Sequence, residues 1–260
     1  SPLAPASVDY VYRDIKQNLC LSSIAGGTDI ISCFICGCPI LPDYRGELQC
    51  AGLGMDVKVL REDGSEADNG ETGELCCASP FPATPLSFWG DEDGSRLRAA
   101  YFEKFPGMWA HGDFISRSET GGFVIEGRSD ATLNPGGVRI GTAEIYRQAE
   151  SLDEVLESIC VGQDWEDDVR VVLFVRLRDG MELDEMLEQR IRRTIRNNTT
   201  PRHVPAKIIQ VADIPRTISG KIVELAVRDV IHGRPAGNRD ALANPEALDL
   251  YRDLPQLKTP

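Results

Sequence analysis

The sequence EGRSDATLNPGGVRI, at residues 126–140, separates two parts of the chain that differ in character. A strand-like run at residues 122–126 leads into it, and a helical pattern begins just after it. Charged residues, a proline and adjacent glycines at a strand-to-helix junction are more typical of a functional loop than of a passive turn, although a polar connector between two core elements is the alternative. We therefore predict a domain boundary at Asp130.

The two sides of this boundary predict different local folds. Before it, strand patterns such as residues 74–77 are separated by turns rich in glycine and proline, which predicts a small barrel-like β subdomain between Gly46 and Asp113. After it, strand patterns alternate with helical ones, which predicts a small α+β domain. The expected fold class is α/β in this mixed sense, followed at residues 233–260 by a tail that packs along the surface or stays loose.

The chain is acidic, with 41 acidic and 28 basic residues and a net charge of −13 at pH 7. This balance argues against a nucleic acid or an anionic membrane as a partner, because both require a basic surface. It does not exclude phosphate ligands, which a few basic side chains and backbone N–H groups can hold. The longest apolar runs are interrupted by charge well before membrane-spanning length, so we expect no membrane span.

Eight cysteines raise the alternatives of disulfides and a metal site. Cys33, Cys36 and Cys38 form the only cluster with a spacing close to that of metal ligands, and no second Cys or His pair follows at zinc-finger distance. The first residues have neither the basic start nor the long apolar stretch of a signal peptide. We therefore expect reduced, mostly buried thiols in a cytoplasmic protein, with zinc as the minor alternative.

Four segments resemble, in the same order, the motifs of the adenylate-forming acyl-CoA synthetases. GGTD at 26–29 is similar to the family's nucleotide motif Gly-x-Thr-Glu, and WAHGD at 109–113 is similar to its ribose motif Thr-Gly-Asp. GRSDATLNPGGVRIGTAE at 127–144 resembles the hinge motif, and PRTISGK at 215–221 resembles Pro-Lys-Thr-x-Ser-Gly-Lys. One match alone would be weak, but four in order are a strong signal.

The resemblance implies a two-step reaction and a two-domain organisation. A carboxylate would attack the α-phosphate of ATP to give an acyl-adenylate and pyrophosphate, and the coenzyme A thiol would then displace AMP to give a thioester. Residues 1–129 would be the C-terminal part of the large nucleotide-binding domain, and residues 131–232 the small mobile domain. The first step joins two anions, so it requires Mg²⁺ and cationic side chains.

The resemblance assigns the nucleotide to residues before the boundary. Gly26 and Gly27 would bring the backbone close to the ligand. Thr28 would contact the α-phosphate, and Asp29 would be the Mg²⁺ carboxylate where the family usually has the longer Glu. The alternative for Asp29 is a residue that caps a turn. Asp113 would accept hydrogen bonds from the ribose hydroxyls, and Arg128 would be a second ribose or phosphate contact.

The resemblance assigns motion and catalysis to residues from the boundary onward. Asp130 would be the hinge between an adenylating and a thioester-forming pose. In the first pose Lys221 would bridge the substrate carboxylate and ATP. In the second, Gly136 and Gly137 would line the pantetheine tunnel, and Arg139 would contact phosphate. An ordinary surface lysine is the alternative for Lys221.

Two further features bear on substrate and completeness. Relatives specific for acetate place a Trp where this chain has Gly26, after Ala25, so we expect a larger acyl pocket that suits acetoacetate or a similar short acid. The family's phosphate-clamping loop is absent, so we expect the chain to be a C-terminal portion whose partner is the missing N-terminal part, and to be inactive alone. A truncated, non-catalytic binding module is the alternative, which the intact Lys221 and Asp113 disfavour.

Overall fold

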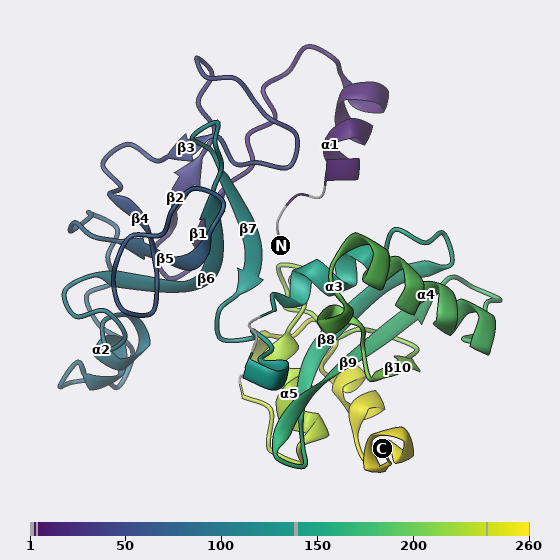
Figure 1. Cartoon of the computed structure of the whole chain (residues 1–260). Coiled ribbons are helices and arrows are strands. Elements are labelled where there is room, and N and C mark those ends of the chain that lie inside the picture. Colours follow the sequence, from purple (N-terminus) through teal and green to yellow (C-terminus); the bar gives the residue numbers. More distant parts are fainter. Residues whose placement is uncertain (1–2, 4, 138–139, 238, 260) are drawn as a thin grey trace. The chain divides into compact units, whose positions relative to one another are not determined.

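The computed structural model describes residues 3, 5–137, 140–237 and 239–259. The chain forms two compact units, Pro2–Ser129 and Asp130–Pro260 (Figure 1). Each unit has its own β-sheet structure and its own buried hydrophobic clusters.

The N-terminal unit is built mainly from antiparallel strands. Its sheets have the strand orders β1-β2-β3 and β4-β5-β6-β7. The elements of the unit are α1 (Pro5–Tyr10), a π-helical turn (Val11–Ile15), β1 (Ala25–Gly27), β2 (Ser32–Cys36), β3 (Cys50–Ala51), β4 (Val57–Leu60), β5 (Thr72–Cys77), α2 (Ser95–Tyr101), β6 (Trp109–Arg117) and β7 (Phe123–Arg128).

The larger sheet of this unit is open rather than barrel-like. Its edges are β4 and β7, and no described strand joins them. Four strands are too few to close around a core of side chains. The smaller sheet covers one face instead, since Phe34 and Ile35 of β2 share a buried cluster with Leu75 of β5 and Ile115 of β6. The expectation of a barrel-like subdomain is therefore wrong in its closure, although the antiparallel strands themselves are present.

The C-terminal unit alternates helices with the strands of one sheet. The sheet order is β10-β9-β8, with β8 and β9 antiparallel and β9 and β10 parallel. The elements are a 3₁₀ turn (Pro135–Gly137), α3 (Thr142–Ala149), β8 (Val155–Trp165), β9 (Asp168–Leu177), α4 (Glu185–Asn198), a 3₁₀ turn (Pro201–His203), β10 (Lys207–Gln210), α5 (Glu224–Ile231) and three further 3₁₀ segments (Arg239–Ala241, Pro245–Tyr251 and Pro255–Lys258).

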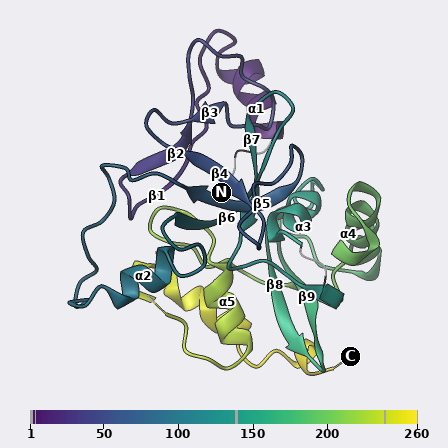
Figure 2. The same ribbon diagram turned by 60° about the vertical axis from the view of Figure 1, so that its left-hand side comes forward.

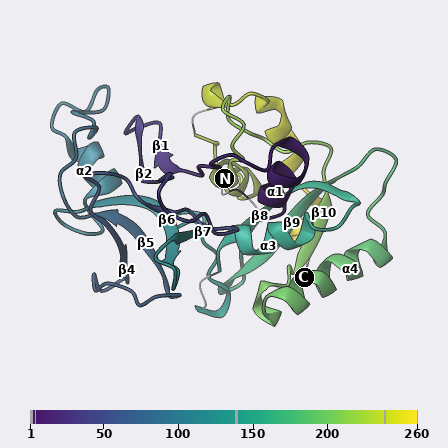
Figure 3. The same cartoon turned by 90° about the horizontal axis from the view of Figure 1, so that it is seen from above.

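Both faces of this sheet are buried, because successive residues in the middle of β9 are all apolar and point to opposite faces. Leu173 and Val175 point to a core shared with α3 and α4, whereas Val172 and Phe174 point to a core shared with α5 and the tail. Figure 3 shows the strands between these two layers. The mixed α/β class predicted from the sequence is confirmed.

The tail at residues 233–260 contributes to the core between the sheet and α5. Leu248 and Tyr251 are fully buried, and Figure 2 shows the yellow C-terminal segments beside α5. The prediction of a surface-bound or loose tail is therefore wrong. It failed because the apolar residues of the tail are spaced for short 3₁₀ turns and give neither a helical nor a strand period.

Within the described residues, every helix is too short or too polar to cross a lipid bilayer.

Candidate functional site

The tip of the β1–β2 hairpin carries the GGTD segment. Gly27 pairs with Ser32, and residues 28–31 form the turn between them. Thr28 is exposed, and Asp29 accepts a hydrogen bond from the Ile30 N–H through Oδ1 (3.1 Å). Ile31 follows with φ of 47° and 92% of its surface exposed. A β-branched residue in this region is strained by about 1–3 kcal/mol, so the tip is a special conformation rather than a relaxed turn.

An aromatic pair connects Asp29 to the ribose motif. The Tyr101 hydroxyl, at the end of α2, donates to Asp29 Oδ2 (2.6 Å), and its ring stacks on Trp109 with centroids 3.7 Å apart. The Trp109 indole N–H donates to His111 Nδ1 (3.3 Å). Because an indole nitrogen can only donate, His111 Nδ1 is the acceptor, and the other ring nitrogen, Nε2, lies 3.8 Å from Asp113 Oδ2. The nucleotide and ribose motifs therefore meet in one network.

The WAHGD segment forms a bulge on β6. Cys76 of β5 pairs with Ala110, but Glu74 pairs with Phe114, so three residues of β6 stand opposite one residue of β5. Such a bulge redirects side chains. It places Asp113 directly across from Arg128 of β7, with Oδ1 and Nη1 3.4 Å apart.

The buried carboxylate of Glu74 stabilises this bulge. Only 1% of its surface is exposed, and its carboxylate accepts from the Gly112 N–H (2.9 Å), the Ser129 hydroxyl (2.9 Å) and the Lys104 ammonium (2.5 Å). Gly112 has φ of 81°, which favours glycine. Glu74 thus fixes the backbone at Gly112, the residue before Asp113.

The glycines at the start of the motif allow close contacts. A Cβ at Gly27 would lie 2.9 Å from Cε1 of His111. A Cβ at Gly26 would lie 2.5 Å from Cα of Cys33, because β1 approaches β2 closely there. Gly26 is therefore required by strand packing, whatever the acyl group. The larger acyl pocket stays a prediction, and a substitution at Gly26 is a poor test of it.

Substitution of Gly26 is expected to destabilise the N-terminal unit. In Gly26→Ala the methyl group meets backbone rather than a side chain that can move, so we expect a loss of about 1–3 kcal/mol in unfolding free energy. Urea denaturation followed by fluorescence measures it. Gly237→Ala is the control, because a Cβ there has open space around it. Equal stability of the two variants would contradict the packing argument.

The donor set around Asp29 fits Mg²⁺ held jointly with a phosphate ligand. No group of three or more His, Cys, Asp or Glu side chains within the described ranges is placed to hold a metal ion. Mg²⁺ is usually bound by one or two carboxylates together with substrate phosphates and water. One partly exposed carboxylate at the tip of a hairpin meets that requirement, so Asp29 could be such a ligand.

The C-terminal unit begins at Asp130, which is exposed and whose carbonyl oxygen accepts from Arg228 (3.2 Å). Gly136 has φ of 58°, and its N–H donates to both carboxylate oxygens of Asp168 (3.1 and 2.9 Å). Gly137 ends the same 3₁₀ turn. Arg139 lies outside the described residues. Asp168 thus anchors the glycine turn, although an acidic run such as residues 164–168 is more typical of a solvated loop.

Lys221 ends a tight turn with a fixed backbone. The Thr217 N–H donates to the Lys221 carbonyl oxygen (2.8 Å), and the Lys221 N–H donates to the Thr217 hydroxyl oxygen (3.1 Å). Gly220, with φ of 82°, allows the reversal. The Lys221 side chain is exposed, and no salt bridge to it is found among the described residues. The turn therefore presents a free ammonium group.

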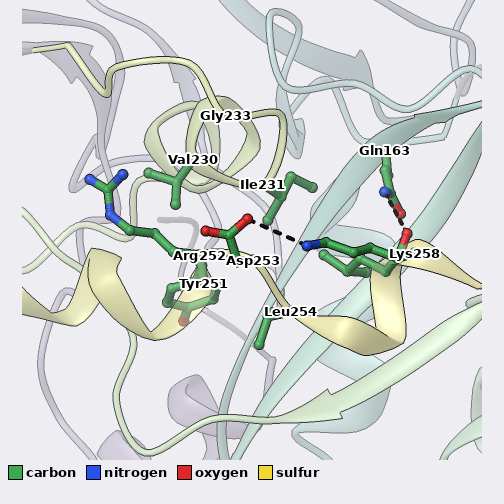
Figure 4. Close-up of a pocket in the computed structure, with 10 residues that line it drawn as sticks. Gln163, Val230, Ile231, Gly233, Tyr251, Arg252, Asp253, Leu254 and Lys258 are labelled. Carbon is green, nitrogen blue, oxygen red and sulfur yellow. Dashed lines mark hydrogen bonds and ion pairs between the residues drawn. The ribbon is translucent and has the colours of Figure 1, made fainter.

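The predicted residues fall into separate groups. Gly27, Asp29, Asp113 and Arg128 gather in the N-terminal unit, whereas Asp130, the glycine turn and Lys221 belong to the C-terminal unit. A pocket of about 120 Å³ in that unit contains none of them (Figure 4). It lies between α5 and the tail and is lined by Gln163, Val230, Ile231, Gly233, Tyr251, Arg252, Asp253, Leu254, Leu257 and Lys258.

Comparison with known proteins identifies the family. The profile of the AMP-binding enzyme C-terminal domain matches residues 148–221. The acetoacetyl-coenzyme A synthetase of Rhizobium meliloti is 61% identical over 259 residues, which is 100% of this chain and 40% of that protein. The chain belongs to the adenylate-forming acyl-CoA synthetases. The resemblance seen in its motifs is thereby confirmed.

Two further acetoacetyl-CoA synthetases are similar to this chain over almost all of its length. The acetoacetyl-CoA synthetase of Mus musculus is 50% identical and covers 99% of this chain and 38% of its own length. The structure of acetoacetyl-CoA synthetase from Streptomyces lividans superposes with a TM-score of 0.89 at 40% identity, over 100% of this chain and 40% of that one. The chain thus spans about two fifths of the synthetases it matches, and corresponds to their C-terminal part.

Several residues that the chain places around its motifs were not found from the sequence. Tyr101 and Glu74 act through contacts with residues 72 and 38 positions away. No local pattern signals such contacts. Asp168 belongs to an acidic segment at residues 164–168, and nothing in the sequence pointed to Gly136 as its partner.

Proposed function

We propose that this chain is the C-terminal part of an ATP-dependent acid:CoA ligase that activates acetoacetate as an acyl-adenylate and transfers the acyl group to coenzyme A. The observation that carries the proposal is the meeting of Asp29, Asp113 and Arg128 within one network of the N-terminal unit. Similarity to acetoacetyl-CoA synthetases of two organisms supports the choice of acid. ATP, Mg²⁺ and coenzyme A are the cofactors.

In this proposal each unit contributes a different part of the chemistry. Asp113 accepts hydrogen bonds from the ribose hydroxyls, and Arg128 beside it contacts ribose or phosphate. Thr28 donates to the α-phosphate from the exposed tip of the hairpin. Mg²⁺ bound at Asp29 would neutralise phosphate charge. These contacts orient ATP for attack by the substrate carboxylate.

Lys221 completes the first step in this proposal, and the glycine turn serves the second. The exposed ammonium group of Lys221 draws the carboxylate and the α-phosphate together and stabilises the charge that develops between them. Asp130, the first residue of the C-terminal unit, is the hinge. Gly136 and Gly137 then line the passage of pantetheine, and Arg139 contacts phosphate. The acyl group passes to the thiol, and AMP leaves.

The decisive experiment uses the full-length protein that contains this chain. It is supplied with ATP, Mg²⁺, coenzyme A and a panel of short acids, and the thioesters are identified by mass spectrometry. Acetoacetyl-CoA as the dominant product is expected. A preference for another short acid would overturn the choice of substrate, and failure to form any acyl-adenylate would favour a non-catalytic module.

Loss of the Tyr101 hydroxyl is expected to raise the KM of the full-length protein for MgATP. Tyr101→Phe keeps the stack on Trp109 but removes the hydrogen bond that fixes Asp29. The KM for MgATP in adenylation should rise roughly tenfold or more, since one hydrogen bond to a charged group is worth about 1.5 kcal/mol or more. Steady-state kinetics at varied MgATP measures it.

Tyr12→Phe is the matched control for this substitution. It removes another tyrosine–aspartate hydrogen bond of the same unit, from Tyr12 to Asp43 (3.1 Å), at the surface. Its KM should stay unchanged. A similar rise in both variants would mean that the Tyr101 hydroxyl supports only the fold.

A further inference from the structure

The tail is paired with the turn that carries Lys221. Residues 241–243 run beside residues 216–218 of the motif. Thr217 and Leu242 form an antiparallel bridge there. Two backbone hydrogen bonds flank it, from the Ile218 N–H to the Ala241 carbonyl oxygen (3.0 Å) and from the Ala243 N–H to the Arg216 carbonyl oxygen (2.9 Å).

The Asn244 side chain completes this attachment. Its Oδ1 accepts from the Arg216 N–H (2.9 Å). Its Nδ2 donates to Asp213 Oδ2 (2.6 Å) and to the Ile214 carbonyl oxygen (3.0 Å). All three bonds therefore end on the segment that leads into the lysine turn. A single amide that satisfies three polar groups of one segment holds that segment in one conformation.

The tail itself is firmly placed, so it can serve as a support. The Tyr251 hydroxyl donates to the Asp213 carbonyl oxygen (3.0 Å), and its ring meets Phe174 of β9 edge-to-face with centroids 4.8 Å apart. The ring is fully buried. Asn244 thus connects the part of the tail that Tyr251 anchors in the core to the segment that leads into the lysine turn.

The other side of the segment is held by the sheet. The Arg216 guanidinium pairs with Glu157 of β8 (2.5 Å), and Arg176 of β9 lies 3.5 Å from Asp213. The base of the turn is therefore fixed from two directions, whereas Lys221 at its end is exposed. A fixed base under a free ammonium group is the arrangement required to aim that cation.

We propose that Asn244 is a positioning residue for Lys221, and that the tail is a working part of the lysine site. Asn244 acts through residues 213–216 and touches no substrate. This inference rests on the proposed role of Lys221 in adenylation. It also assigns a role to the buried residues of the tail, which lies beyond the residues matched by the family profile.

The test compares half-reactions in the full-length protein. Asn244→Ala should slow acyl-adenylate formation roughly tenfold, the effect of losing one or two net hydrogen bonds at a catalytic group. Thioester formation from supplied acyl-adenylate and coenzyme A should stay within twofold. Asn198→Ala is the matched control, because it removes an asparagine hydrogen bond to Gln148 (2.9 Å) at the end of α4. It should alter neither half-reaction.

A side-chain swap guards against a variant that fails to fold. Asp213→Asn with Asn244→Asp exchanges donor and acceptor between the two positions and keeps an acceptor for the Arg216 N–H. It should recover part of the adenylation rate, because an aspartate at position 244 cannot donate to the Ile214 carbonyl oxygen. Equal loss in both half-reactions, no loss in Asn244→Ala, or no recovery in the swap would overturn the proposal. If Lys221→Ala itself spares adenylation, the proposed function fails first, and the two failures are thereby distinguished.

Discussion

Replacement of Lys221 by alanine in the full-length protein is expected to slow acyl-adenylate formation on the order of a hundredfold or more, and to leave thioester formation nearly unchanged. The exposed ammonium group would stabilise the attacking carboxylate and the α-phosphate at once, a contribution on the order of 3 kcal/mol for one well-placed donor. Because Lys221 lies beyond the proposed hinge, it would occupy the site in the adenylating pose alone. Rapid-quench assays of each half-reaction separate the two effects.

The controls for this prediction test charge and location separately. Lys221→Gln removes the charge but keeps most of the length, as acetylation of the lysine would, and should match the alanine variant. Lys258→Ala removes a surface lysine of the same unit that pairs with Asp253 (3.5 Å), and should change neither half-reaction. If Lys221→Ala slows both half-reactions equally, Lys221 supports the fold or a shared site, and the two-pose interpretation fails.

The parts of the fold that were predictable have strong local patterns. Residues 169–177 of β9 are so rich in β-branched and other apolar residues that a strand follows from the sequence alone, and α4 has its apolar residues on one face. The boundary of the two units falls at Asp130, where the sequence changes character. Closure of the β subdomain was not predictable, because it depends on strand number and on which sheet covers which face.

The parts of the site that were not predictable depend on long-range contacts. The motif residues Asp29 and Asp113 were found by their resemblance to a family. The residues that hold them were not: Tyr101 reaches Asp29 from a short helix, and Glu74 reaches Gly112 from the neighbouring strand. A buried carboxylate such as Glu74 is recognisable only once its partners are known.

Gly26 illustrates how one residue supports two explanations. From the sequence, the absence of a side chain suggests space for a longer acyl group. In the structure, the same absence lets β1 approach β2, because a Cβ would meet the backbone of Cys33. A motif glycine therefore does not by itself measure the size of a pocket.

Loss of Asp113 is expected to impair both half-reactions, in contrast to loss of Lys221. Asp113→Ala removes the acceptor for two ribose hydroxyls and leaves Arg128, 3.4 Å away, without this partner. Two hydrogen bonds to a charged group are together worth about 3 kcal/mol or more, so ATP affinity and kcat/KM for adenylation should fall on the order of a hundredfold. Calorimetry with ATP measures the loss of binding.

The contrast depends on when each group is needed. The ribose is present in ATP and in the acyl-adenylate, so a residue that holds it should matter in both steps, whereas a cation for the attacking carboxylate matters once. Asp56→Ala is the matched control, because Asp56 lies on the same unit with its carboxylate 3.8 Å from the Lys58 ammonium, and it should bind ATP normally. If Asp113→Ala slowed adenylation alone and left the acyl-adenylate well bound, Asp113 would be acting on the phosphates or the metal, and its assignment to the ribose would be wrong.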